Sequence, residues 1–306
     1  MRPLLAQLLD TLIVLFGVSA LVFLLLTLIP GDPVDVILGE SARPADRAAM
    51  QAALGLDKPL TTRFRDFYLG LVQGDLGDSL VRRQPVMELI LQRLPATVQL
   101  AGAAFVLVVL ISLPLGTVAA WRQGEWPDRA ARLFALVGVS IPNFWLGPLL
   151  VLAFSVHLGW TPVSGNIEPG SLVLPALTLG LSMAAITTRM VRSSLLEIAG
   201  QPFLRTARCK GLAEGQVLLR HALPNAVLPV ITVLGLQLGA LLAGAVITEV
   251  VFAWPGIGSL LIDAIRQRDY PVVQGVVLLI AVVYVLVNRG TDLLAATLDP
   301  RIRDNA

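Results

Sequence analysis

The chain has few charged residues and few residues that bind metals. Of its 306 residues 14% are charged, against about 25% in an average soluble domain, and the formal net charge is only +2. The only cysteine is Cys209, and the only histidines are His157 and His221. This composition excludes a disulfide within the chain, and it gives no reason to expect a metal site or a nucleic-acid partner.

Motifs for nucleotide binding and for catalysis are also missing. Lys58 and Lys210 are the only lysines, and neither belongs to a phosphate-binding glycine loop. No nucleophile, acid–base pair or ligand cluster occurs at a useful spacing. We therefore expect a protein that is not an enzyme and holds no cofactor. If ATP drives it, another chain must bind the ATP.

Apolar residues make up 56% of the chain and lie in long blocks. A bilayer core of about 30 Å needs roughly 20 apolar residues of helix, and six stretches reach this length. They are 10–29, 96–120, 133–158, 172–190, 227–249 and 272–294. The first is too long for a signal peptide, and no small-residue cleavage site follows it. The sequence predicts an all-α integral membrane protein with six transmembrane helices.

Basic residues gather in alternate loops of this arrangement. They lie between the second and third spans, from Arg189 to Arg220, and in the C-terminal tail, whereas the loop at 159–171 has none. Basic loops stay in the cytoplasm, so we expect both termini to be cytoplasmic. Residues 31–95 then form an external segment that is partly helical, with helices at 45–54 and 59–72. This segment either caps the outer membrane surface or docks something that arrives from outside.

The middles of the spans contain no Asp, Glu, Lys or Arg. Ion-coupled transporters usually keep such residues for the coupling ion, so the chain resembles a passage without its own source of energy. Gln237 and Gln274 either line that passage or bond a neighbouring helix. Gly235 and Gly239 form a small-x-x-x-small pair, which packs either within the chain's own bundle or against a second membrane subunit.

A charged stretch, RTARCKGLAEGQVLLRHALP, separates the fourth and fifth spans. It must lie outside the hydrocarbon, because each charge at the bilayer centre costs about 2.5–3.5 kcal/mol. As a helix it places Phe203, Ala207 and Gly211 on one face, and such a small-residue face suits close approach by another body. Gly211 ends this helix, and a second helix follows at 212–223. The alternative is an amphipathic helix that lies on anionic membrane lipid.

The same stretch resembles the EAA signature of ABC importer permeases. The family pattern is Glu-Ala-Ala-x-x-x-Gly, nine residues, then Ile-x-Leu-Pro. Here Arg205-Thr206-Ala207, Gly211 and His221-Ala222-Leu223-Pro224 take its place, with departures at Arg205, Thr206 and His221. Further motifs of the dipeptide, oligopeptide and nickel branch follow in order. They are IPGDP (29–33), LGLDKPL (54–60), GDLGDS (74–79), RLPAT (93–97), FAWPGIG (252–258), RDYPVVQG (268–275) and LDPRIR (298–303).

The resemblance implies a type I ABC importer permease fold. Residues 1–30 would be the N-terminal transmembrane helix, 31–95 the external segment, and 96–306 a permease core with a coupling helix near 203–213. This helix would rest in a groove on an ATP-hydrolysing subunit. The implied coupling residues are Phe203, Leu204, Arg205, Thr206, Ala207, Lys210, Gly211 and Leu212, and the end of the EAA loop is His221, Leu223 and Pro224.

A second loop resembles the family's loop near the outer gate. It contains Trp254, Pro255, Gly256 and Gly258. The alternative for this loop is a Pro-Gly turn with a tryptophan at the membrane interface.

The resemblance also implies partners, location and cargo. The partners are a second homologous permease, two subunits that hold ATP and Mg, an external substrate-binding protein and membrane lipid. The location is the bacterial cytoplasmic (inner) membrane. Small peptides are the expected cargo, and nickel, glutathione or opine import are alternatives within the branch. A secondary transporter that works alone, or a structural membrane protein, would be a different class.

Overall fold

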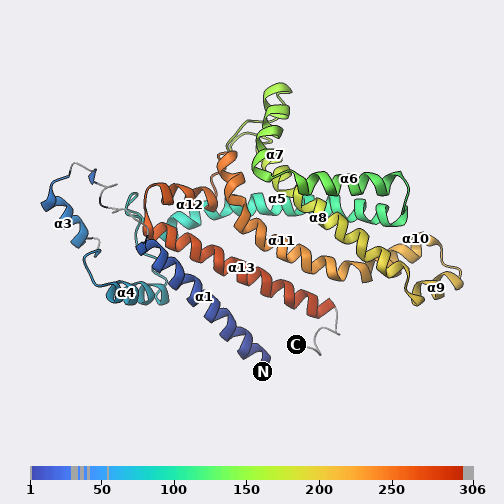
Figure 1. The fold of residues 1–306 in the computed structure, drawn as a ribbon, viewed down its shortest axis with the longest axis horizontal. Helices are drawn as coiled ribbons and strands as arrows, with labels where there is room; N and C mark the ends of the chain where they lie inside the picture. Colours follow the sequence, from blue (N-terminus) through green and yellow to red (C-terminus); the bar gives the residue numbers. More distant parts are fainter. Residues whose placement is uncertain (1, 29–33, 35–37, 40–41, 54, 299–306) are drawn as a thin grey trace. The chain divides into compact units, whose positions relative to one another are not determined.

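The computed structural model describes residues 2–28, 34, 38–39, 42–53 and 55–298. Within these residues the regular elements are helices (Figure 1), and the one β-bridge, between Asp78 and Pro85, is isolated. The predicted all-α class is confirmed. Parts of three motifs lie outside the described residues. These parts are IPGDP at 29–33, residue 54 of LGLDKPL and residues 299–303 of LDPRIR.

Apolar helices occupy all six predicted stretches. Four helical stretches pass a test of length and hydropathy for crossing a membrane. Two are whole helices, α5 (Val86–Trp121) and α8 (Val173–Ala199). The third, Glu214–Leu241, ends within α11 (Leu223–Val251), and the fourth, Tyr270–Leu294, lies within α13 (Tyr270–Leu298). In addition, α1 (Arg2–Leu28) contains the shorter apolar stretch Thr11–Leu24. The remaining stretch, 133–158, falls on a pair of helices that pass the test only together.

This pair is sharply bent. It consists of α6 (Trp126–Ser140) and α7 (Asn143–Leu150), which the π-helix η1 (Val151–His157) extends, and its two parts meet at 104°. Pro142 restricts Ile141 to an extended backbone, with φ −90° and ψ 116°. Helix α6 therefore ends at Ser140, and the stretch 133–158 is two helical segments and not one straight helix.

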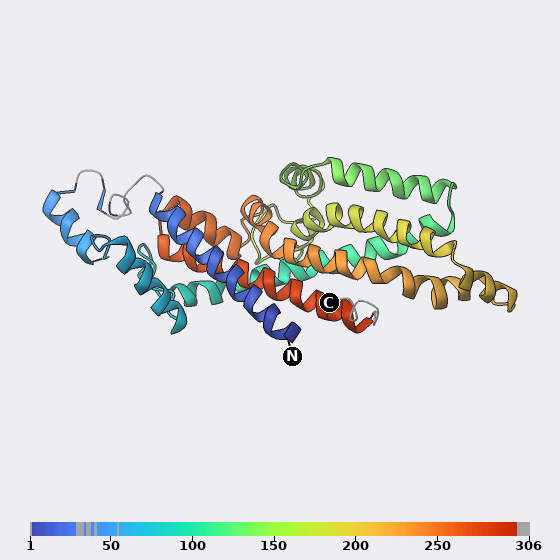
Figure 2. The same cartoon turned by 60° about the horizontal axis from the view of Figure 1, so that its bottom comes forward.

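Among the described residues, one compact unit consists of residues 98–254 and 284–298. Within it α8 packs against both α6 and α11 (Figures 1 and 2). The Thr187 hydroxyl of α8 donates a 2.9 Å hydrogen bond to the Gln237 side-chain oxygen of α11. Gln237 thus bonds a neighbouring helix, which was one of the two roles left open for it.

The glycine pair of α11 serves packing inside the same unit. A Cβ added at Gly235 would lie 2.1 Å from Thr291 Oγ1 of α13, and one at Gly239 would lie 3.1 Å from the Tyr284 ring. The two glycines thus leave room for these side chains of α13 against α11. The structure therefore favours packing within the chain's own bundle over contact with a second subunit.

The other unit consists of the described residues of 2–97 together with residues 255–283. It contains α1, α3 (Pro44–Ala53), α4 (Leu60–Val72) and α12 (Ile257–Arg266), with the first parts of α5 and α13. Its core joins α5, α12 and the start of α13 through Leu89, Leu260 and Val276. Aromatic residues of α4 pack on α1, with the Phe64 and Phe23 ring centroids 5.3 Å apart. Helix α12 was not predicted.

Candidate functional site

The turn between α8 and α11 contains the EAA-like motif. It is built from α9 (Pro202–Cys209), α10 (Glu214–Val217) and the π-helix η2 (Leu218–Ala222), and it lies at one end of the α8–α11 pair (Figure 1). We call residues 200–222 the α8–α11 turn. Because the second short helix continues without a break into α11, any displacement of this turn acts on two long helices.

Local sequence explains the shape of the turn. Pro202 starts α9, a position where its missing N–H costs nothing. Gly211 has φ +82°, in the left-handed region that favours glycine, and nothing lies within 4 Å of a Cβ built on it. Arg208 Nε then donates a 2.9 Å hydrogen bond to Glu214 Oε1 across the turn. The second helix begins at Glu214, two residues later than predicted.

One face of α9 is buried in the chain itself. Leu204 and Ala207 belong to a core cluster with Val217 and Ala222. The expectation that Ala207 lies on a face open to another body is therefore wrong, and Leu204 is likewise unavailable for direct contact. The two side chains instead anchor α9 to its own unit.

The rest of α9 is exposed. Its accessible side chains include those of Phe203, Arg205, Thr206, Arg208, Cys209 and Lys210, and Gly211 is exposed in the turn that follows. Leu212 is half-buried. Phe203 stands out because 42% of this large apolar side chain is accessible. The α8–α11 turn therefore presents one aromatic ring among cationic and small polar groups.

The second half of the motif connects the turn to α11. His221 and Leu223 are half-buried and Pro224 is exposed. Pro224 lies in the first turn of α11, and the Asn225 amide donates a 2.7 Å hydrogen bond to the His221 carbonyl. These residues form the start of α11, a position where the missing N–H of a proline is tolerated.

A buried ion pair joins α6 to α8 on the chain segment that leads into the turn. Asp128, in the first turn of α6, is 1% exposed. It accepts hydrogen bonds from Arg192 Nε at 2.6 Å, from Arg192 Nη2 at 3.1 Å and from the Gly124 N–H at 2.9 Å. The guanidinium thus binds both carboxylate oxygens, and this bidentate geometry fixes the orientation of the two side chains as well as their distance. This Asp128–Arg192 pair was not predicted from the sequence.

The loop after α11 buries its tryptophan. Trp254 is 1% exposed, and its backbone N–H donates a 2.7 Å hydrogen bond to the Glu249 backbone carbonyl. The Gly165 N–H donates to the Phe252 carbonyl at 2.8 Å, which ties the loop at 159–171 to the end of α11. Trp254 is therefore a packed residue of the chain's interior.

The residues that follow start α12. Gly256 precedes the first helical residue, and Gly258 is buried in the first turn. The Ile257 N–H donates a 2.8 Å hydrogen bond to Thr97 Oγ1, and the Ser259 hydroxyl donates to the Gly256 carbonyl at 2.8 Å. Pro255 and Gly256 therefore belong to an ordered helix start.

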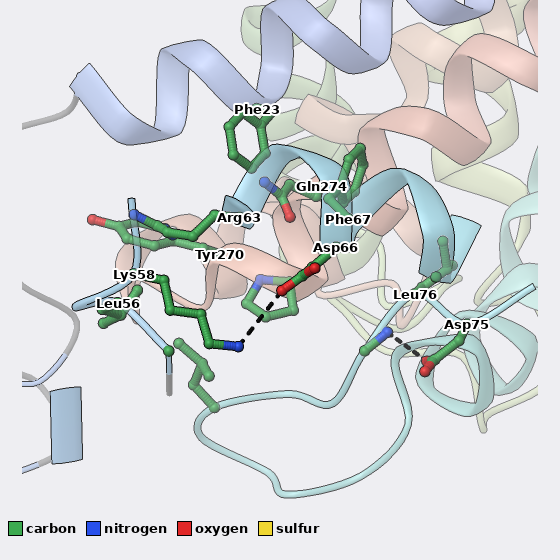
Figure 3. A pocket seen from close by; sticks show the side chains of 15 residues that line it. Phe23, Leu56, Lys58, Arg63, Asp66, Phe67, Asp75, Leu76, Tyr270 and Gln274 are labelled. Carbon is green, nitrogen blue, oxygen red and sulfur yellow. Dashed lines mark hydrogen bonds and ion pairs between the residues drawn. The ribbon is translucent and has the colours of Figure 1, made fainter. Parts of the chain in front are cut away.

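A polar pocket of about 310 Å³ lies in the unit that contains α1 and α4 (Figure 3). Its wall includes two cations, Lys58 and Arg63, and two carboxylates, Asp66 and Asp75. Lys58 Nζ lies 3.5 Å from Asp66 Oδ2, and Gln274 borders the same pocket. Mixed charges of this kind suit a polar occupant. Among the described residues no group of three or more His, Cys, Asp or Glu could hold a metal.

Two family descriptions cover the chain. Residues 112–304 match the binding-protein-dependent transport system inner membrane component, and residues 1–101 match the N-terminal region of the same kind of membrane component. Among relatives, the di/tripeptide transport system permease protein DppB of Pseudomonas aeruginosa is 45% identical, with 94% of each chain covered. The dipeptide transport system permease protein DppB of Escherichia coli K12 is 42% identical, again with 94% of each covered. The glutathione transport system permease protein GsiC of Escherichia coli O6:H1 is 43% identical with the same coverage.

Solved structures share the fold. A chain of the inward-facing MetNI methionine ABC transporter is similar with a TM-score of 0.58 and 20% identity, over 70% of this chain and 97% of that one. A chain of an amino acid ABC transporter solved with histidines is similar with a TM-score of 0.53, over 70% of this chain and 94% of that one. The predicted ABC importer permease fold is confirmed. The chain belongs to the family of binding-protein-dependent transport system inner membrane components, the multi-pass permeases of ABC importers.

Proposed function

We propose that this chain forms half of the membrane pore in an ATP-driven importer of di- and oligopeptides. The observation that carries the peptide assignment is the 45% identity, over 94% of both chains, to a permease named for di- and tripeptides. The glutathione permease at 43% identity favours a second candidate. Glutathione is itself a tripeptide, so the two candidates share a cargo with an ammonium and carboxylate groups on a peptide backbone.

The proposed assembly contains a second homologous permease, two subunits that bind ATP and Mg, and an external substrate-binding protein. This chain supplies no cofactor. Its termini lie in the cytoplasm, and the α8–α11 turn lies on the same side, which agrees with the basic residues from Arg189 to Arg220. The gate on the external side would be built around Trp254, Pro255, Gly256 and Gly258.

The α8–α11 turn would be the contact with the ATP-hydrolysing subunits. The exposed Phe203, Arg205, Thr206 and Lys210 meet the partner, while Leu204 and Ala207 hold α9 to its own unit. When the partner moves, α9 transmits the displacement to α8 and α11. The Asp128–Arg192 pair passes it on to α6. The pore thereby alternates between outward and inward access.

Replacement of Gly211 by tryptophan tests this contact. The bulky side chain and the loss of a left-handed glycine should abolish uptake of a labelled dipeptide into vesicles that contain the complete assembly, while ATP hydrolysis continues. Gly159→Trp is the matched control, because Gly159 also has a positive φ, of +63°, and no atom within 4 Å of a built Cβ. It lies in the loop at 159–171, outside the α8–α11 turn and outside the contacts of Asp128, and should leave coupling intact. Normal uptake by Gly211→Trp would refute the proposed contact.

A further inference from the structure

A second cavity, of about 330 Å³, lies between α6 and α8. Ala135, Leu136 and Val139 of α6 form its apolar part. Three arginines, Arg132 of α6 with Arg189 and Arg192 of α8, also line it. The cavity is separate from the α8–α11 turn and from the polar pocket of the other unit. It combines a surface for an acyl chain with a strongly basic edge.

The arginines of this α6–α8 crevice are not fully neutralised. Asp128 takes two N–H groups of Arg192 and lies 3.5 Å from Arg132. Arg189 has no ion pair or hydrogen bond within the part of the chain that the structure describes. Three guanidinium groups thus face one carboxylate, an excess of two positive charges. An anion of high charge density is the natural complement, because planar guanidinium groups bind phosphate oxygens in pairs.

A buried hydroxyl provides an independent sign of a missing partner. Thr188 lines the same crevice and is 1% exposed. Within the described residues its Oγ1 has no hydrogen-bond partner. An unpaired buried polar group costs about 1–3 kcal/mol, so an occupant with acceptor oxygens would remove that cost.

The outer face of α6 beside the crevice is apolar. Leu136 is 66% exposed and Val139 is 55% exposed. In an inner membrane protein such a face meets lipid tails, and basic pockets between helices on the cytoplasmic side bind anionic headgroups. A packed protein helix would cover the apolar part but would leave Arg189 without an anion. A free phosphate ion would pair with Arg189 but would leave the apolar part uncovered.

We propose that the α6–α8 crevice binds one anionic phospholipid. The phosphate lies between Arg132 and Arg189, and one acyl chain follows Ala135, Leu136 and Val139. The Thr188 hydroxyl donates to a phosphate or ester oxygen. The lipid therefore fills the gap between the two helices that the Asp128–Arg192 pair joins.

Native mass spectrometry of the full chain, with its accompanying subunits, tests the site. The protein is titrated with phosphatidylglycerol, and neutral phosphatidylcholine serves as the comparison lipid. Each arginine near a membrane surface contributes about a fivefold gain in affinity for anionic lipid, so Arg132→Gln with Arg189→Gln should lose about 25-fold. Arg122→Gln, an exposed arginine outside the crevice, should change the affinity less than twofold.

A second variant tests the apolar part without touching charge. Ala135→Phe fills the floor of the crevice and should also weaken phosphatidylglycerol binding. Unchanged binding in the double arginine variant, or in Ala135→Phe, would overturn the proposal. In a Cys209→Ser background, cross-linking from Val139→Cys to another protein chain would overturn it too, because a protein would then occupy the crevice.

Discussion

Removal of Arg192 should destabilise the chain far more than removal of its neighbour Arg132. In Arg192→Ala, Asp128 stays buried but loses the two hydrogen bonds of 2.6 and 3.1 Å. Loss of one partner from a buried ion pair costs about 3–5 kcal/mol. The lower end applies here, since the Gly124 N–H remains at 2.9 Å and Arg192 itself is 20% exposed. We expect a loss of about 3 kcal/mol in the free energy of unfolding.

Arg132→Ala is the matched control. Arg132 meets the same carboxylate, but at 3.5 Å and with 56% of its side chain exposed. An exposed ion pair contributes at most about 1 kcal/mol, so this variant should be close to the native protein. The two positions share one partner and one residue type, and they differ in burial and geometry. The comparison therefore isolates the contribution of the bidentate contact.

Unfolding of the purified protein in lipid nanodiscs measures both variants. A double-mutant cycle with Asp128→Ala should give a coupling energy of about 2 kcal/mol between Asp128 and Arg192, within the range for residues in direct contact. If Arg192→Ala costs no more stability than Arg132→Ala, the Asp128–Arg192 pair does not join α6 to α8, and the proposed transmission to α6 fails with it.

Three other predictions concern packing, a buried carboxylate and the energy source. Gly235→Ala should destabilise the folded chain by about 1–3 kcal/mol in thermal unfolding, because its Cβ would overlap Thr291. Gly102→Ala has open space around its Cβ and should stabilise the folded chain by up to about 1 kcal/mol. Equal effects of the two substitutions would contradict the close helix contact. Asp269→Ala removes the acceptor of the Ser79 hydroxyl and the Leu80 N–H, so amide hydrogen exchange at Leu80 should accelerate, and an unchanged rate would count against this contact. A proton or sodium ionophore should leave uptake into ATP-loaded vesicles intact, and prompt loss of uptake would favour a secondary transporter.

The positions of the long helices followed from the sequence because length and apolarity are local properties. The bend in the third stretch did not, although Pro142 was visible. A proline inside an apolar helix produces anything from a kink to a full break, depending on how neighbouring helices satisfy the freed backbone groups. Helix α12 was missed because its ten residues are too short to give a membrane signal, and they follow a Pro-Gly pair that resembles a loop.

The shape of the α8–α11 turn was also predictable, but the roles of its residues were not. Gly211 could be identified as a helix end because a left-handed residue is a local requirement. The burial of Leu204 and Ala207 depends on Val217 and Ala222, which approach α9 only when the turn folds back. The Asp128–Arg192 pair spans 64 positions, and no periodic pattern links two such residues before α6 and α8 are packed.

The most direct test of the account is to purify the tagged full-length chain gently from its native membrane and to identify the accompanying proteins by mass. The account predicts stoichiometric ATP-binding subunits together with a second permease of the same family. Their recovery should fall in the Gly211→Trp variant, because the α8–α11 turn is the proposed contact, and remain normal in Gly159→Trp. A native chain that is recovered alone, or only with copies of itself, would contradict an ATP-driven importer and would direct the search to an ion gradient.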